Sequence, residues 1–186
     1  MLKRSLTLGL TIVALVLAFT PKTMAEGIGS RFILQDHDGK FVQDASFQGG
    51  FMLITFGYSF CPDICPTALS TMGTAMDGLG EKAQHVIPIF ITVDPERDTV
   101  RQLHDYVPNF HPRLVGLTGS KEMIDRVAQG YKVRYEKVES EDKDPGAYTI
   151  DHTASIFLMG PNGQFLVKFI HNMDPDAMAK RILDFF

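Results

Sequence analysis

The stretch 51-FMLITFGYSFCPDICPT-67 contains both cysteines of the chain and the clearest signal of its secondary structure. Residues 51–58 form a continuous apolar and β-branched run, which is typical of a central strand covered on both faces. Behind it, leucine and methionine residues recur at spacings of three and four, which predicts a helix over 66–79 that faces a core. Cys61 and Cys65 are therefore expected where a buried strand passes into a helix.

Together with this strand and helix, the remaining apolar runs predict an α/β sandwich, with helices packed on a mixed central sheet. Asp38-Gly39 supplies the chemistry of a hairpin turn. Ser120 is a predicted N-cap for a helix that Gly130 would end in the left-handed conformation. The other predicted elements are an N-terminal hairpin over 31–43, strands over 86–94 and 113–119, a helix over 99–107, a polar surface loop over 136–148, a hairpin over 155–170 and a final helix from Asp174.

The first 25 residues predict a signal peptide or a membrane anchor. Lys3 and Arg4 precede a charge-free stretch over 5–21 that is rich in leucine, isoleucine, valine and alanine. A bilayer span usually takes about 20 apolar residues, and 23–25 offer a small-residue cleavage site, so cleavage is favoured over anchoring. One globular domain over 26–186 would follow, located in the periplasm or cell envelope and held at the inner membrane if the segment stays.

The composition is that of an ordinary globular domain, with 45% hydrophobic and 22% charged residues and a formal net charge of −4. Removal of the leader would take away Lys3, Arg4 and Lys22 and make the remainder more acidic. Non-specific DNA affinity comes largely from phosphate neutralisation by Lys and Arg. The sequence therefore predicts no nucleic-acid partner.

Cys61 and Cys65 can form a structural disulfide, a redox-active pair or part of a metal site. A disulfide is expected in an oxidising compartment, but closing so short a loop removes little unfolded-state entropy. The start of a helix lowers the pKa of nearby thiols and makes both cysteines reactive. Thioredoxin-type enzymes use C-x-x-C, whereas three residues intervene here. Two thiolates four residues apart can instead bind one ion, which favours a metal site with redox chemistry as the alternative.

A two-thiolate site needs a third ligand, and His152 is the candidate among six histidines. It stands at the entry to an apolar strand, where it is either a ligand or a core residue, and Asp151 beside it could orient the imidazole. Soft thiolates favour Cu(I) or Zn, and imidazole accepts copper in either oxidation state. Met72 and Met76 are predicted to be core residues. The remaining histidines, predicted to be solvated, are His37, His85, His104, His111 and His171.

Four motifs together resemble the Sco/SenC family over residue 27 to the C-terminus. They are FGYSFCPDICPT (56–67), ITVDPERDT (91–99), GLTGS (116–120) followed by a helix, and DHTASIFLMGPNGQF (151–165). The resemblance implies a thioredoxin-like, peroxiredoxin-related fold. It also implies one copper ion, Cu(I) or Cu(II), bound by Cys61, Cys65 and His152, with Asp94 and Asp151 in supporting roles.

The same resemblance implies a copper metallochaperone that delivers copper to, or prepares, the dinuclear copper centre of cytochrome c oxidase. Its implied partners are the copper-centre subunit of the oxidase, a copper donor protein and a thiol reductant. The alternative is a thiol-disulfide oxidoreductase that reduces target cysteines, or a redox or copper sensor in the cell envelope. Whether the protein is an enzyme is therefore left open by the sequence.

Overall fold

The computed structural model describes residues 27–139 and 148–186, so the predicted signal or anchor segment lies outside the described residues. The strands are β1 (Ile33–Asp36), β2 (Phe41–Gln43), β3 (Phe51–Gly57), β4 (Val86–Thr92), β5 (Val115–Thr118), β6 (Tyr135–Glu139), β7 (Tyr148–His152), β8 (Ser155–Met159) and β9 (Phe165–Ile170). The helices are α1 (Ile64–Gly78), α2 (Val100–Tyr106), α3 (Lys121–Gly130) and α4 (Pro175–Leu183), with short 3-10 helices at Asp44–Phe47, Gly80–His85 and Val107–Asn109.

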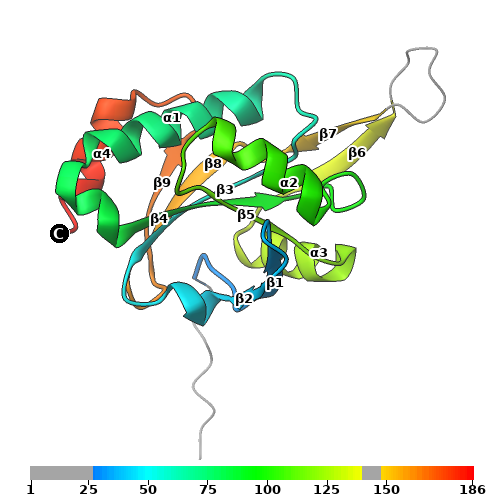
Figure 1. Ribbon diagram of the computed structural model, residues 1–186, viewed down its shortest axis with the longest axis horizontal. Coiled ribbons are helices and arrows are strands. Elements are labelled where there is room, and N and C mark those ends of the chain that lie inside the picture. Colours follow the sequence, from blue (N-terminus) through cyan, green and yellow to red (C-terminus); the bar gives the residue numbers. More distant parts are fainter. Residues whose placement is uncertain (1–26, 140–147) are drawn as a thin grey trace, which may run out of the picture.

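Seven strands form one mixed sheet in the order β2-β1-β5-β4-β3-β8-β9. Strands β3, β4 and β5 run parallel, whereas β1 and β8 pair antiparallel with β5 and β3. Figure 1 shows α1, α2 and α4 on one face of this sheet and α3 on the other. The predicted α/β sandwich with a mixed sheet and an N-terminal hairpin is confirmed.

Strand β3 lies in the middle of the sheet and is buried along its whole length. Successive side chains of a strand point to opposite faces, and here Ile54 and Phe56 pack in one core while Leu53 packs in the other. Because helices cover both faces, the strand is apolar or small at every position except Thr55, whose hydroxyl donates to the carbonyl of Ser155 at 3.2 Å. This explains the continuous apolar run in the sequence.

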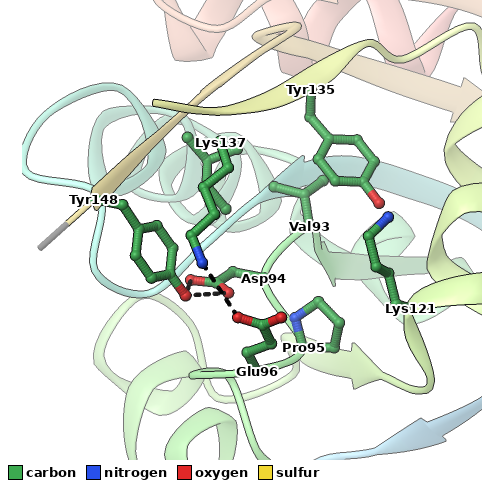
Figure 2. Close-up of a pocket in the computed structure, with 9 residues that line it drawn as sticks. Val93, Asp94, Pro95, Glu96, Lys121, Tyr135, Lys137 and Tyr148 are labelled. Atoms are coloured by element: carbon green, nitrogen blue, oxygen red, sulfur yellow. Dashed lines mark hydrogen bonds and ion pairs between the residues drawn. The ribbon is translucent and has the colours of Figure 1, made fainter. Parts of the chain in front are cut away.

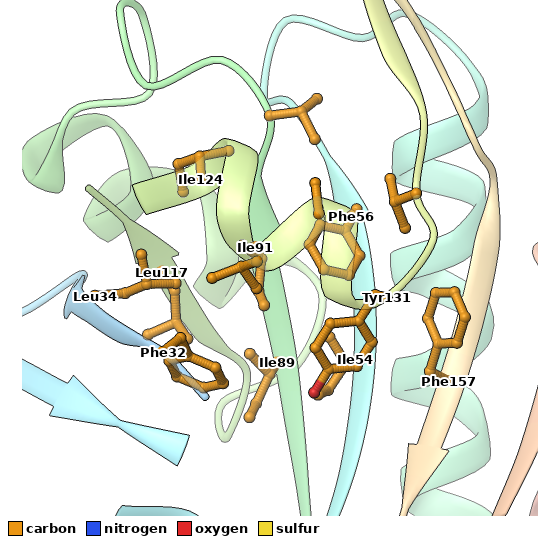
Figure 3. Close-up of a cluster of buried hydrophobic side chains, with 14 of the residues drawn as sticks. Phe32, Leu34, Ile54, Phe56, Ile89, Ile91, Leu117, Ile124, Tyr131 and Phe157 are labelled. Carbon is orange, nitrogen blue, oxygen red and sulfur yellow. The ribbon is translucent and has the colours of Figure 1, made fainter. Parts of the chain in front are cut away.

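The core beneath α3 supports the strand end from which the cysteine loop leaves. Figure 3 shows Phe56, Tyr131 and Phe157 packed together there. The ring centre of Phe56 lies 5.4 Å from that of Tyr131 and 6.3 Å from that of Phe157. The ring centres of Tyr131 and Phe157 are 5.6 Å apart. Offset and edge-on aromatic pairs at these distances are favourable, so the carboxyl end of β3 is held firmly.

Two helix ends differ from the sequence-based expectation. Helix α1 begins at Ile64, with Asp63 as N-cap, so it starts earlier than the predicted helix over 66–79. Helix α3 begins after its predicted N-cap, Ser120, but Gly130 belongs to the helix, and the left-handed conformation falls on Lys132. Gly130 is needed for a different reason, because a Cβ there would collide with Ser30.

A second sheet of two strands, β6 and β7, was not predicted. The charged residues of β6 were interpreted as part of a surface loop, but they pair antiparallel with β7, and Tyr135 lies opposite His152. This hairpin does not join the seven-stranded sheet. His152 therefore ends β7 of a separate hairpin, and the apolar strand that follows, β8, begins only at Ser155.

Candidate metal site

The cysteine loop connects the carboxyl end of β3 to the amino end of α1, as predicted. The backbone N–H of Cys61 donates to the carbonyl of Tyr58 at 3.2 Å, which closes a turn directly after the strand. Cys65 falls in the first turn of α1, and its N–H donates to Sγ of Cys61 at 3.4 Å. Cys61 is partly exposed and Cys65 is buried, and both are free thiols.

Gly57 makes room for the second cysteine. A Cβ atom at position 57 would lie 2.6 Å from Sγ of Cys65 and 3.0 Å from the ring of Phe90. Because real Cβ atoms do not approach other atoms so closely, the last residue of β3 has to be glycine for Cys65 to keep its place. The FGY motif contains this glycine, but its role appears only when α1 packs on β3.

His152 reaches the cysteines from β7. Its Nε2 atom lies 3.2 Å from Sγ of Cys65, and the ligand atoms of Cys61, Cys65 and His152 all lie within 4.8 Å of one another. Two atoms that bind one ion at the 2.3 Å typical of zinc–sulfur bonds can be at most about 4.6 Å apart. The three side chains therefore fit one metal ion with only a slight contraction.

Burial controls the protonation of two of these groups. It raises the pKa of the Cys65 thiol, which is opposite to the lowering expected from the helix start, because desolvation of the thiolate dominates. Burial also lowers the pKa of His152, although the Thr153 carbonyl and Asp151 act in the other direction. The imidazole is thus neutral and ready to bind a metal, whereas Cys65 has to release a proton when a metal binds.

Asp94 lies just beyond the end of β4, and only 3% of its surface is exposed. It forms an ion pair with Arg97 and accepts a hydrogen bond from the hydroxyl of Tyr148 at 2.9 Å. Tyr148 is the first residue of β7, the strand that ends at His152. Asp94 is therefore connected to the candidate ligand through β7 and does not touch it.

The structure does not bring the carboxylate of Asp151 to the imidazole. Asp151 is exposed, and neighbouring residues of a strand point to opposite faces. The Nδ1 atom of His152 instead lies 3.3 Å from the carbonyl oxygen of Thr153. Asp151 can act on His152 only through its charge.

Sequence reasoning missed Asp98, which is fully buried below the cysteine loop. It accepts hydrogen bonds from the backbone and the hydroxyl of Ser59, at 3.0 and 2.5 Å, and from the hydroxyl of Thr92 at 2.6 Å. Burial raises the pKa of this carboxyl group. Asp98 fixes the start of the loop, and the proximity of its segment to Ser59 could not be read from a single sequence.

Within the described residues, the other histidines do not belong to the cluster. Met72 and Met76 are buried in the core, as predicted. His85 and His104 are exposed, as expected of solvated histidines. His37 and His111 are not fully exposed, contrary to the expectation. His37 accepts a hydrogen bond from Gly116 N–H, and the side chain of His111 is only 11% exposed. Among residues 27–139 and 148–186, no helix combines the length and apolarity that a membrane crossing requires.

The chain is similar to known proteins in both sequence and fold. Residues 20–186 match the family SCO1/SenC. The chain is 42% identical over 164 residues to "Protein SCO1 homolog 1, mitochondrial" of Arabidopsis thaliana, a match that covers 88% of this chain but 48% of that protein. The chain thus spans about half the length of this relative.

Solved structures of similar proteins share the fold. Bradyrhizobium japonicum ScoI, solved with copper bound, superposes with a TM-score of 0.79 at 41% identity, over 86% of this chain and all of that chain. BsSco, described as having a disulfide switch and as a member of the Sco family of cytochrome c oxidase assembly proteins, superposes with a TM-score of 0.67 at 27% identity, over 87% and 95%. The fold is the thioredoxin-like one, and this chain belongs to the SCO1/SenC family.

Proposed function

We propose that this protein is a copper metallochaperone that carries one copper ion as its cargo and delivers it to the dinuclear copper centre of cytochrome c oxidase. The observation that carries the proposal is the convergence of Cys61, Cys65 and His152 within 4.8 Å, from two segments that lie far apart in the chain. Asp94 and Asp151 act in support, the first by holding β7 and the second through its charge.

The donor set favours copper over harder metals. Two thiolates are soft ligands that select Cu(I), and a neutral imidazole binds both Cu(I) and Cu(II). A closed structural zinc site would usually have four ligands, whereas the described residues bring three together. A three-coordinate ion leaves one side open for a ligand of the receiving protein.

The exposure of the ligands suits transfer of the ion. Cys61 and His152 are partly exposed, while Cys65 is buried beneath them. A cysteine of an acceptor protein can approach the ion from the side of Cys61, so that ligands are exchanged one at a time. Cys65 holds the ion until the exchange is complete.

The receiving protein is proposed from the family. BsSco is described as a member of a family of cytochrome c oxidase assembly proteins, and the acceptor here would be the copper-centre subunit of that oxidase. A copper donor protein and a thiol reductant would act before delivery, because both cysteines have to be reduced to bind Cu(I). A location in the periplasm or cell envelope follows if 1–25 act as the predicted signal or anchor.

Thiol-disulfide exchange as the main activity is less well supported. An attacking thiol has to be ionised, and burial raises the pKa of Cys65. An imidazole 3.2 Å from the buried sulfur of Cys65 also serves a metal site better than an exchange reaction at the partly exposed Cys61.

The proposal is tested in cells that lack the gene. The copper content of purified cytochrome c oxidase is measured after complementation with the wild type, with the double variant Cys61→Ser, Cys65→Ser, or with the control His104→Ala, whose exposed side chain lies on α2. We expect copper-loaded oxidase with the wild type and the control, and copper-depleted oxidase with the double variant. Equal copper content in all three would overturn the proposal.

A further inference from the structure

The geometry points to Tyr58 as the positioning residue that couples the cysteine loop to His152 and thereby sets how well the imidazole binds copper. Asp94 and Arg97 complete the arrangement by holding the far end of the same strand. The inference rests on the proposed copper site. It concerns the preference of that site between Cu(I) and Cu(II), because the imidazole matters more to the oxidised ion.

Tyr58 contacts both halves of the site. Its carbonyl accepts the N–H of Cys61 at 3.2 Å, and its hydroxyl accepts the N–H of Ile150, two residues before His152, at 3.2 Å. Its ring also meets the imidazole of His152 edge-on, with centroids 6.0 Å apart at 82°. Only 2% of Tyr58 is exposed, so the side chain has little freedom to move.

The hairpin needs such a tether because it does not belong to the main sheet. Strand β7 pairs with β6, and β6 and β7 make a two-stranded sheet of their own. An isolated two-stranded hairpin is at best marginally stable in water. The hydrogen bond from Ile150 to Tyr58 joins this hairpin to the loop that carries the cysteines.

The outer end of β7 has a second attachment, shown in Figure 2. The Tyr148 hydroxyl donates to Asp94 at 2.9 Å, and Nη1 of Arg97 donates to the Tyr148 carbonyl at 3.2 Å. The guanidinium of Arg97 lies 3.6 Å from the centre of the Tyr148 ring. Burial and Asp94 raise the pKa of Tyr148 to about 12, so its hydroxyl keeps its proton and continues to donate at neutral pH.

Removal of the Tyr58 hydroxyl should change the position of His152 and leave the two cysteines in place. The Ile150 N–H loses its acceptor in a buried place, and β7 can then shift relative to the sulfurs, whereas Cys61 and Cys65 stay within one contiguous loop. Loss of a group that orients a metal ligand typically reduces affinity about 10- to 100-fold. We expect that loss for Cu(II) and a much smaller one for Cu(I), which the two thiolates hold.

The experiment compares Tyr58→Phe with the matched control Tyr106→Phe. The hydroxyl of Tyr106 is buried and has no hydrogen-bond partner among the described residues, so the control removes the same atom without a tether. Cu(I) affinity is measured anaerobically by competition with a chelator, and Cu(II) affinity and the thiolate-to-copper absorption band are measured separately. In the metal-free protein, amide hydrogen exchange at Ile150 and His152 gives a readout that does not involve copper.

For Tyr58→Phe we expect at least a tenfold loss of Cu(II) affinity, a shifted absorption band and faster exchange at Ile150, with Cu(I) affinity within a few-fold of the wild type. Wild-type Cu(II) affinity and band in folded Tyr58→Phe would overturn the inference. If Tyr58→Phe does not fold, Tyr148→Phe, which frees the outer end of β7, has to show the same selective loss. A wild-type protein that binds no copper through its cysteines would instead refute the proposed function.

Discussion

The Sγ atom of Cys65 lies 3.2 Å from Nε2 of His152, although 87 positions separate the two residues in the chain. One sulfur comes from the first turn of α1 and the nitrogen from the end of β7, two elements that belong to different parts of the fold. The site therefore exists only when the hairpin is docked against the cysteine loop.

Replacement of this histidine should weaken copper binding without unfolding the protein. In His152→Ala we expect a large loss of Cu(II) affinity and a smaller loss for Cu(I), because imidazole is the ligand that suits the oxidised ion. His152 is partly exposed, so circular dichroism should remain close to that of the wild type. The control His104→Ala should bind as the wild type does, and an unfolded His152→Ala protein would identify His152 as a core residue.

The two cysteines should differ in reactivity in the metal-free, reduced protein. Cys65 is only 2% exposed, and burial raises the pKa of its thiol, so little thiolate is available there at pH 8. Each unit of pKa changes the thiolate fraction about tenfold. Alkylation followed by mass spectrometry should therefore be at least about tenfold faster in Cys65→Ser, which keeps Cys61, than in Cys61→Ser. Similar rates would mean that the loop opens readily.

Gly57→Ala should destabilise the protein by about 1–3 kcal/mol, the usual cost of overpacking a core. The new methyl group would lie 2.6 Å from Sγ of Cys65. In a Cys65→Ala background that sulfur is absent, so the same substitution should cost less. A double-mutant cycle of urea unfolding measures the coupling between the two positions. An equal cost in both backgrounds would show that Phe90, which the methyl also approaches, is the obstacle.

His111 should make the free energy of unfolding depend on pH. Burial lowers the pKa of His111, and its Nδ1 accepts the N–H of Arg113 at 3.1 Å. The unfolded chain thus takes up the proton more readily, so this stabilisation is present above pH 6.5 and is lost as pH falls through the folded pKa. Relative to that of His111→Gln, the free energy of unfolding of the wild type should fall by about 0.5–1.5 kcal/mol between pH 7.5 and 5, because one hydrogen bond contributes about this much. Parallel pH curves in urea unfolding would contradict this.

The part of the site that contains the two cysteines lies in one stretch of the chain and was predictable from the sequence. The apolar run of β3, the spacing of the cysteines and the stripe of α1 are local patterns, and the structure places them as predicted. The strand predicted over 86–94 is also present as β4, although it ends at Thr92, shortly before Asp94. Family motifs indicated His152 as the candidate third ligand, which the residues alone left open.

The position of the β6-β7 hairpin and the burial of Cys65 depend on tertiary contacts that no local pattern reveals. The residues of β6 are mostly charged and largely exposed, so they lack the alternation that marks a half-buried strand. The hydroxyl of Tyr58 reaches a strand 92 positions away. The pKa of Cys65 was wrongly expected to fall, because the helix start is a local feature whereas burial arises from the whole fold.

The most direct test is Cu(I) loading of the reduced domain without oxygen, with the metal counted and its ligands identified by X-ray absorption. We expect one copper ion per chain, bound by two sulfurs and one nitrogen, and no tight binding by the double variant Cys61→Ser, Cys65→Ser. A copper ion without sulfur ligands, or binding by the double variant equal to that of the wild type, would contradict it.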